Sequence, residues 1–132
     1  MQMLIDGFDQ RFILDLPQMD DTHSEFVDLV NRLADANREE FASLFKNLAE
    51  HTQSHFDSEQ QMMEESHFPA IAEHISDHQR ILGELARFGK RVAAGSTTMA
   101  RAYVSEQLPN WFELHIQTMD SALAAHLKNN QV

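Results

Sequence analysis

The sequence predicts an all-α protein, an antiparallel up-down-up-down four-helix bundle with an irregular N-terminal arm. Four long segments carry apolar residues at alternating steps of three and four, the period of a helix face turned toward a core. Short turn signals containing Pro, Gly or Asn separate these segments, and short connections favour antiparallel neighbours. No segment shows the strict alternation of apolar and polar residues that indicates a strand.

The 132 residues are enough for one domain with a substantial core, so we assign residues 1–132 to a single domain. Residues 1–18 form the arm, in which apolar residues follow no clean period, and residues 19–129 form the bundle. We expect the arm to close one side of the bundle. The run Asp15-Leu16-Pro17 predicts a turn into the first helix.

The first helix is predicted from near Asp20 to near Asn37, with Pro17 before it. Asp20 or Asp21 can cap its N-terminus and favour its positive end. Its inward-facing residues follow steps of three and four, and a histidine occupies the first of these core positions: His23, Phe26, Val30 and Leu33.

The second helix is predicted from about Glu39 to Glu65. Its inward positions are 41, 45, 48, 52, 55, 59 and 62. His55 and Glu59 occupy two of them, where core packing favours Leu or Ile. Because a buried ionised carboxylate is costly unless it is paired or bound to a metal, an ion is expected at this point of the core.

The third helix is predicted from about Pro69 to Ala94, with Pro69 in its first turn and Gly95 as a left-handed cap. Its seven inward positions follow strictly alternating steps of three and four residues, and two histidines lie one turn apart among them: Ile71, His74, His78, Ile81, Leu85, Phe88 and Val92.

The fourth helix is predicted from Thr97 or Thr98 to about Asn129. Its inward residues are Val104, Leu108, Trp111 and His115, followed by Asp120, Leu123 and Leu127. The step of five from His115 to Asp120 predicts a single-turn π-bulge, a feature that favours functional sites. Pro109 removes one helical hydrogen bond and is expected to bend the helix.

Composition narrows the function further. A net charge of −11 argues against nucleic acid or an anionic membrane surface as a partner. The absence of Cys excludes disulfides, thiolate metal sites and Cys nucleophiles. No apolar run approaches the ~20 residues of a membrane span. The N-terminus has no basic region followed by an apolar block, so we expect no signal peptide and a cytoplasmic location. No feature of the sequence indicates a particular protein partner.

The four predicted helices each carry metal-ligand residues at core positions: His23, His55, Glu59, His74, His78, His115 and Asp120. One ion seldom uses seven protein ligands, whereas two ions bridged by both carboxylates would use all of them. Such pairs typically lie roughly 3.5–4 Å apart. Imidazole with carboxylate suits Fe, Zn, Cu or Ni and tells against Ca and Mg. His51, His67 and His126 lie off these positions, and we expect none of them to bind metal.

The five candidate histidines cannot divide evenly between two ions, so one ion keeps an open position, as a binding or catalytic metal requires. The pocket around that position should be apolar. Residues within about one turn of the candidate ligands are its expected lining: Phe26, Val27, Trp111, Phe112, Ile116 and Met119.

The series His23, His55-xxx-Glu59, His74-xxx-His78 and His115-xxxx-Asp120 resembles the pattern of the hemerythrin family, most closely its single-domain bacterial members. The likeness extends to Asp20-xx-His23, to Phe56 after His55 and to Trp111-xxx-His115-Ile116, and it covers the chain from about Leu16 to Leu127. The chain departs from the family pattern at Phe112, where Leu is common, and at Pro109.

This resemblance implies a non-haem site of two Fe ions (Fe2+/Fe3+) with an oxo or hydroxo bridge. It implies that three histidines hold one iron, His74, His78 and His115, and that His23 and His55 hold the other. Glu59 and Asp120 would bridge both irons. O2 would bind reversibly at the open position of the two-histidine iron, with NO and small anions such as azide as further ligands.

The resemblance therefore implies an oxygen carrier, store or sensor rather than an enzyme. The alternative is a di-iron enzyme, an oxidase, peroxidase or NO reductase. Because neutral imidazoles outnumber carboxylates, whereas anionic ligands stabilise high-valent iron, the ligand count favours reversible binding. A third interpretation is a dinuclear Zn hydrolase, which elemental analysis distinguishes.

Overall fold

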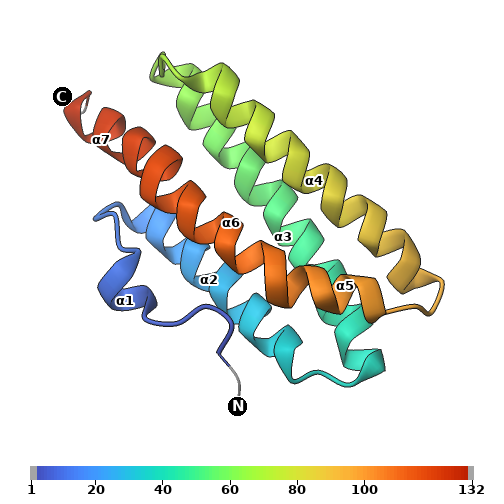
Figure 1. Ribbon diagram of the computed structural model, residues 1–132. Coiled ribbons are helices and arrows are strands. Elements are labelled where there is room, and N and C mark those ends of the chain that lie inside the picture. Colours follow the sequence, from blue (N-terminus) through green and yellow to red (C-terminus); the bar gives the residue numbers. More distant parts are fainter. Residues whose placement is uncertain (1–2, 131–132) are drawn as a thin grey trace.

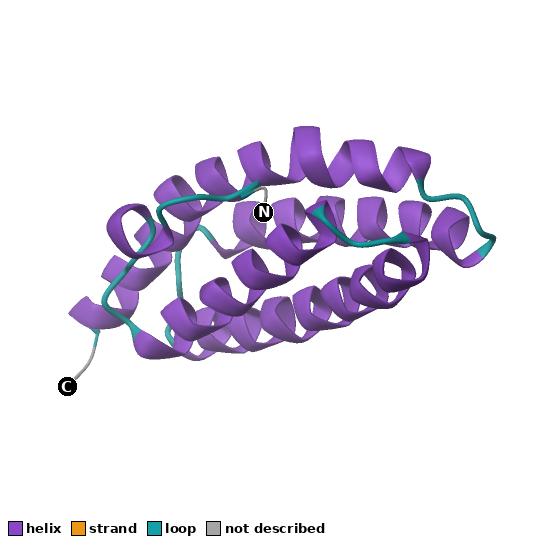
Figure 2. Ribbon diagram, turned by 90° about the horizontal axis from the view of Figure 1, so that it is seen from below, coloured by secondary structure: helices purple, strands orange, loops and turns teal. Residues whose placement is uncertain are grey.

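The computed structural model describes residues 3–130 and confirms the predicted fold class. Three long helices lie side by side with a fourth, interrupted one (Figure 1). The three are α2 (Pro17–Ala34), α3 (Arg38–Glu65) and α4 (Ile71–Ala93). Seen from below, the bundle has its connecting loops at its two ends (Figure 2).

The fourth rod of the bundle consists of five consecutive helical segments, two of them π-helical. In chain order they are α5 (Thr98–Ala102), η1 (Tyr103–Gln107), α6 (Leu108–His115), η2 (Ile116–Asp120) and α7 (Ser121–Asn129). The π-bulge predicted between His115 and Asp120 is present as η2. The spacing of the inward residues did not indicate η1, which ends at Gln107, directly before Leu108-Pro109. Because Pro109 has no N–H to donate and its ring crowds the preceding turn, a wider turn before it accommodates the proline.

The start of α2 corrects the prediction. Pro17 is the first residue of the helix, not a residue before it, which suits its missing N–H. Asp20 does not cap the helix. Its carboxylate instead accepts hydrogen bonds from the backbone N–H groups of Leu14 (2.8 Å) and Leu16 (3.2 Å) and thereby holds the end of the arm against α2.

The buried face of α3 drifts by one residue along its length. Thr52 and Glu59 are buried as predicted, but Phe56 and Met63 are buried next to the half-buried His55 and Met62. A regular 3.5-residue spacing lags a 3.6-residue helix by about 20° per heptad, which explains the drift over 28 residues. At the N-terminus, Asn37 and Glu40 form a reciprocal capping box.

The turns at the two ends of α4 are of different kinds. Pro69 lies before the helix, which starts at Ile71, so the prediction that Pro69 occupies the first turn is wrong. At the other end Gly95 has φ +96°, as predicted for a left-handed cap. The N–H groups of Gly95 and Ser96 bond to the carbonyls of Val92 and Arg91, so the last turn of α4 leaves few carbonyls unpaired.

The N-terminal arm contains a short helix, α1 (Phe8–Arg11), and lies along one side of the bundle (Figure 1). Phe12 is buried against the ring of Phe112 at 5.4 Å between centroids. Asn31 of α2 exchanges two hydrogen bonds of 2.9 Å with the backbone of Ile5. The arm therefore covers the bundle through contacts along its length, among them this aromatic contact, this paired backbone contact and the hydrogen bonds that Asp20 accepts at its end.

The apolar core is divided into two clusters with a polar layer between them. On α2, Met19 belongs to one cluster and Phe26 to the other, and His23 lies between them. The fourth rod repeats this order, since Asp120 separates Ile116 from Leu123. The clusters exclude water on both sides of the polar layer. Within the described residues, no helix is long and apolar enough to cross a membrane.

Candidate metal centre

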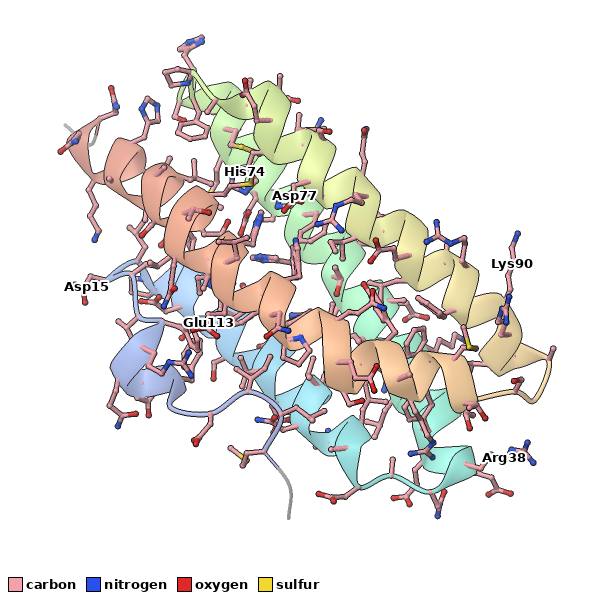
Figure 3. The ribbon with its side chains drawn as sticks, viewed as in Figure 1. Asp15, Arg38, His74, Asp77, Lys90 and Glu113 are labelled. Atoms are coloured by element: carbon pink, nitrogen blue, oxygen red, sulfur yellow. The ribbon has the colours of Figure 1, made fainter. Side chains whose placement is uncertain are left out.

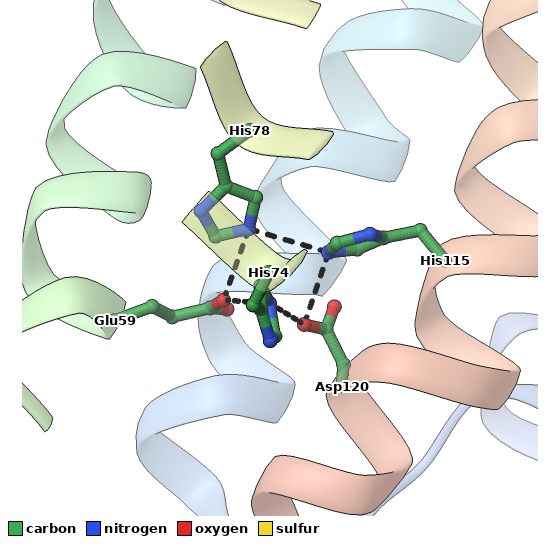
Figure 4. A group of neighbouring side chains, drawn as sticks. All are labelled: Glu59, His74, His78, His115 and Asp120. Atoms are coloured by element: carbon green, nitrogen blue, oxygen red, sulfur yellow. Dashed lines mark hydrogen bonds and ion pairs between the residues drawn. The ribbon is translucent and has the colours of Figure 1, made fainter. Parts of the chain in front are cut away.

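The polar layer consists of the seven side chains singled out in the sequence, contributed by all four rods. Those of Glu59, His74 and Asp120 are almost fully buried, with 0%, 1% and 2% of the residue surface exposed. Glu59 projects from α3, His74 and His78 from α4, and His115 and Asp120 from the fourth rod toward one point (Figure 4). His23 of α2 and His55 of α3 complete the layer on its other side.

The first group of potential ligand atoms comes from Glu59, His74, His78, His115 and Asp120, and these atoms all lie within 4.8 Å of one another. The Oδ1 atom of Asp120 lies 3.0 Å from Nε2 of His74 and 3.2 Å from Nε2 of His115. On the other side, Oε1 of Glu59 lies 3.4 Å from Nε2 of His78. Three imidazoles and two carboxylates therefore face a shared centre.

The second group consists of His23, His55 and Glu59. Nε2 of His55 lies 2.6 Å from Oε2 of Glu59, and Nε2 of His23 lies 3.1 Å from Oδ2 of Asp120. The two oxygens of Glu59 thus face different groups, and so do those of Asp120. This is the arrangement that a carboxylate bridging two cations adopts.

The unpaired polar atoms show that this layer fits metal ions. In the described part of the chain, five buried atoms that face the centre have no hydrogen-bond partner: Nε2 of His23 and His74, Oε1 and Oε2 of Glu59, and Oδ1 of Asp120. Several of them lie within 4 Å of one another without hydrogen-bond geometry. Buried polar groups are rarely left unpaired, and cations between these atoms would satisfy them. The donor set suits transition metals.

The pKa values of the buried groups also indicate a layer that needs positive charge between its carboxylates. Burial alone would lower the pKa of His23, but Asp120 and Glu59 outweigh it and raise that pKa to about 9. Burial likewise opposes charge on His115, yet Asp120 raises its pKa to about 10. The pKa of Asp120 lies well below its usual value, against the effect of burial, because His115 and the neighbouring histidines favour the carboxylate. Without metal, protonated His23 and His115 therefore compensate the two buried carboxylates.

The π-helical turn η2 explains how Asp120 reaches the centre. In a regular α-helix a step of five residues turns the side chain roughly 140° away from the starting face. The π-helical hydrogen bond joins residues five apart and brings them closer to a common face. His115, the residue before η2, and Asp120, its last residue, therefore both point inward.

The predicted pocket lining falls into two parts. Phe112 stacks on Phe26 at 5.1 Å and meets the ring of His23 edge-on at 5.9 Å. Val27 and Ile116 are buried in the same apolar cluster. Met119 departs from the prediction, because it is half-buried and lines an open outer hollow between α4 and η2. Trp111 lies between the two parts, with its ring 4.8 Å from that of His115.

Sequence reasoning missed two contacts of the centre. Phe56 lies parallel to the ring of His78 at 3.6 Å. Asp77 lies beside His74 on α4 (Figure 3) and accepts hydrogen bonds from His115 and Trp111. Both residues directly adjoin a candidate ligand in sequence, since Phe56 follows His55 and Asp77 precedes His78. That adjacency is a signal in the sequence, but it does not reveal which helix the side chain faces.

The three remaining histidines lie outside the two ligand groups. Nε2 of His51 lies 3.2 Å from the carbonyl oxygen of Thr22, and its Nδ1 lies 3.5 Å from Glu25. His126 is bonded to the carbonyl oxygen of Ser66 at 2.8 Å, and His67 is exposed in the turn before α4.

Known proteins share both the sequence pattern and the fold. The sequence pattern of the hemerythrin HHE cation binding domain matches residues 14–127. The bacteriohemerythrin of Ralstonia nicotianae is 33% identical over 108 residues, which span 82% of this chain and 78% of that protein. The bacteriohemerythrin of Methylococcus capsulatus is 28% identical over 105 residues, 76% of this chain and 79% of that protein.

Solved structures extend the likeness to three dimensions. A wild-type hemerythrin superposes with a TM-score of 0.82 over 94% of this chain and 98% of its own, at 24% identity. A leucine-to-tyrosine variant of hemerythrin gives a TM-score of 0.83 over 96% of this chain and 98% of its own, also at 24% identity. Because the domain pattern covers most of the sequence and the first relative is 33% identical, the chain belongs to the hemerythrin family.

Proposed function

We propose that this protein holds two iron ions in the polar layer and binds O2 reversibly there, as an oxygen carrier, store or sensor. The observation that supports this most strongly is the convergence of five imidazoles and two carboxylates, each carboxylate facing both ligand groups. Membership of the hemerythrin family favours iron over the other metals that this donor set would accept.

In this proposal the chain divides the ligands three to two. His74, His78 and His115 would hold one iron, and His23 and His55 the other. Glu59 and Asp120 would reach both. The irons would supply the reversible electron transfer and the open position that O2 binding needs.

The protein's own side chains set the net charge around the metal ions and exclude water from the site. Two carboxylates against five neutral imidazoles give the layer little negative charge, which disfavours high-valent iron and therefore favours binding over oxygen cleavage. The rings of Phe26 and Phe112 cover the side of His23 and exclude water from it. Since a histidine must lose its proton to bind metal, the raised pKa values of His23 and His115 also make metal binding release protons.

The wider role stays a prediction from the sequence. We propose that residues 1–132 act as one domain, with the arm as a cover for the bundle. A cytoplasmic location, the absence of nucleic acid as a partner and the choice between carrier, store and sensor are likewise predictions.

An iron count with a visible absorption spectrum tests the proposed function. The purified protein should contain two irons per chain. After anaerobic reduction it should change its spectrum on mixing with O2, and it should recover the reduced spectrum when O2 is removed. Rapid irreversible oxidation with turnover of an added reductant or NO would instead indicate the enzyme. Two zinc ions per chain would indicate the hydrolase.

His51→Ala is expected to leave the iron content and the visible spectrum unchanged. His51 stacks parallel to His55 at 6.4 Å between ring centroids, but it is bonded to Thr22 outside the two ligand groups. His55→Ala, one turn along α3, is the matched comparison and should lose iron. Equal loss of iron from both variants would show that His51 belongs to the centre.

A further inference from the structure

Asp77 of α4 connects two side chains of the fourth rod to the bundle. His115 Nδ1 donates a hydrogen bond to Oδ2 of Asp77 at 2.7 Å, and the indole Nε1–H of Trp111 donates to the same oxygen at 2.8 Å. Arg80 donates to the other oxygen, Oδ1, at 3.0 Å. The carboxylate is therefore held between two groups from α6 and a cation from its own helix.

This contact distinguishes His115 from other histidines of the polar layer. Nδ1 of His23 and of His74 is buried without a hydrogen-bond partner among the described residues, whereas Nδ1 of His115 faces a carboxylate. The opposite ring nitrogen, Nε2 of His115, lies 3.2 Å from Oδ1 of Asp120 and points into the ligand group. One side of this imidazole thus faces the centre while the other is anchored to Asp77.

The contact also explains the position of Trp111. Its ring stacks on that of His115 with 23° between the planes, and its N–H is directed to Asp77. Asp77 therefore fixes both the imidazole and the aromatic ring that covers it. Its own side chain is 18% exposed and lines the outer hollow with Arg80 and Met119, so the anion lies between that hollow and the polar layer.

We propose that Asp77 is a positioning residue for the metal centre, which fixes the ring orientation and the Nδ1–H tautomer of His115 and so strengthens its Nε2 as a ligand. This inference rests on the proposed metal site. A carboxylate that accepts the second N–H of a ligating histidine raises the basicity of that ligand, and its loss typically lowers metal affinity or activity about 10–100-fold. The anion should also favour the more positive oxidation state of the iron.

Three variants separate positioning from simple loss of charge. Asp77→Asn keeps the shape but replaces one acceptor oxygen by a donor. Asp77→Glu keeps the carboxylate. Glu73→Gln removes a negative charge from the same hollow, one turn away on α4, at a residue without a contact to His115 among the described interactions.

The first readouts are the rate at which a chelator removes iron and the reduction potential of the bound iron. Asp77→Asn should release iron about 10–100-fold faster and shift the potential upward. Asp77→Glu should largely restore both values, and Glu73→Gln should match the wild type. Wild-type values in Asp77→Asn would overturn the inference, and so would equal changes in Asp77→Asn and Glu73→Gln.

A second readout needs no iron chemistry. In protein loaded with zinc and labelled with 15N-histidine, NMR should show a slowly exchanging Nδ1–H for His115 in the wild type and lose it in Asp77→Ala, which has no acceptor at this position. Its persistence in Asp77→Ala would also overturn the inference. Wild-type protein that retains neither iron nor zinc would refute the proposed function itself, whereas metal-loaded wild type with an unaltered Asp77→Asn refutes this inference alone.

Discussion

His74→Ala is expected to lose iron and to lower the free energy of unfolding by about 3–5 kcal/mol. His74 is 1% exposed, and its Nε2 lies 3.3 Å from Oε1 of Glu59 and 3.0 Å from Oδ1 of Asp120. Removing the imidazole takes away a ligand and leaves two buried carboxylates with less compensating charge. An iron count and chemical denaturation of the purified variant measure the two effects.

His51→Ala is the matched control for this prediction. It removes a half-buried imidazole next to the centre that contacts Thr22 and Glu25 and not the buried carboxylates of Glu59 and Asp120. It should retain two irons and most of its stability. If His74→Ala kept two irons and the same unfolding curve as His51→Ala, our assignment of the ligands would be wrong.

Metal-free protein is expected to lose stability as the pH rises from 6.5 to about 10, whereas iron-loaded protein should change little over that range. His23 provides the clearest case. Its pKa is raised from 6.5 to about 9 in the folded state, so its stabilising charge is fully present below pH 6.5 and is lost as the pH rises through 9. This shift alone corresponds to about 3 kcal/mol. His115, with a pKa raised to about 10, acts in the same direction.

At lower pH the dependence runs the other way, and the metal-free protein should lose stability as the pH falls. The pKa values of Glu59 and Asp120 are lowered despite burial and their mutual repulsion, because the surrounding histidines favour the charged carboxylates. Their contribution is present above their unfolded pKa values and is lost as the pH falls. Burial lowers the pKa of His78 to about 3, so below pH 6.5 the unfolded chain binds a proton that the folded chain does not. Metal-free protein should therefore be most stable at mildly acidic pH.

Denaturant unfolding at a series of pH values, with and without iron, measures this difference. Iron takes the place of the protons on the ligand histidines, so bound metal should remove most of the decline between pH 6.5 and 10. A metal-free protein whose stability is constant over that interval would show that the buried histidines are neutral and that the carboxylates are compensated in another way.

The fold class was predictable because helical periodicity is a local property. The step of five between His115 and Asp120 correctly predicted η2, since a π-helical turn is what keeps two residues with that spacing on one face of a helix. The second π segment, η1, was missed because nothing in the spacing of Val104 and Leu108 changes there. The exact buried face of α3 was also missed, because a 28-residue helix accumulates a rotation that an idealised spacing ignores.

The seven polar side chains could be selected from the sequence because each breaks an apolar pattern at a core position. Their meeting in two groups is seen in the structure, and their binding of iron stays a prediction. Met119 satisfied the same rule of proximity along the chain, yet it lines the outer hollow. Being close in sequence to a ligand therefore did not determine the direction of the side chain.

The sequence by itself determined the four helices, the acidic and cysteine-free composition and the identity of the seven side chains of the polar layer, because these depend on residue type and spacing along one segment. Only the tertiary structure decided which oxygen of Glu59 and Asp120 faces which histidine, and that Asp77 of α4 meets His115 and Trp111 of α6. Those contacts join different helices, and they depend on the rotation and depth of each helix in the bundle, which no single segment encodes.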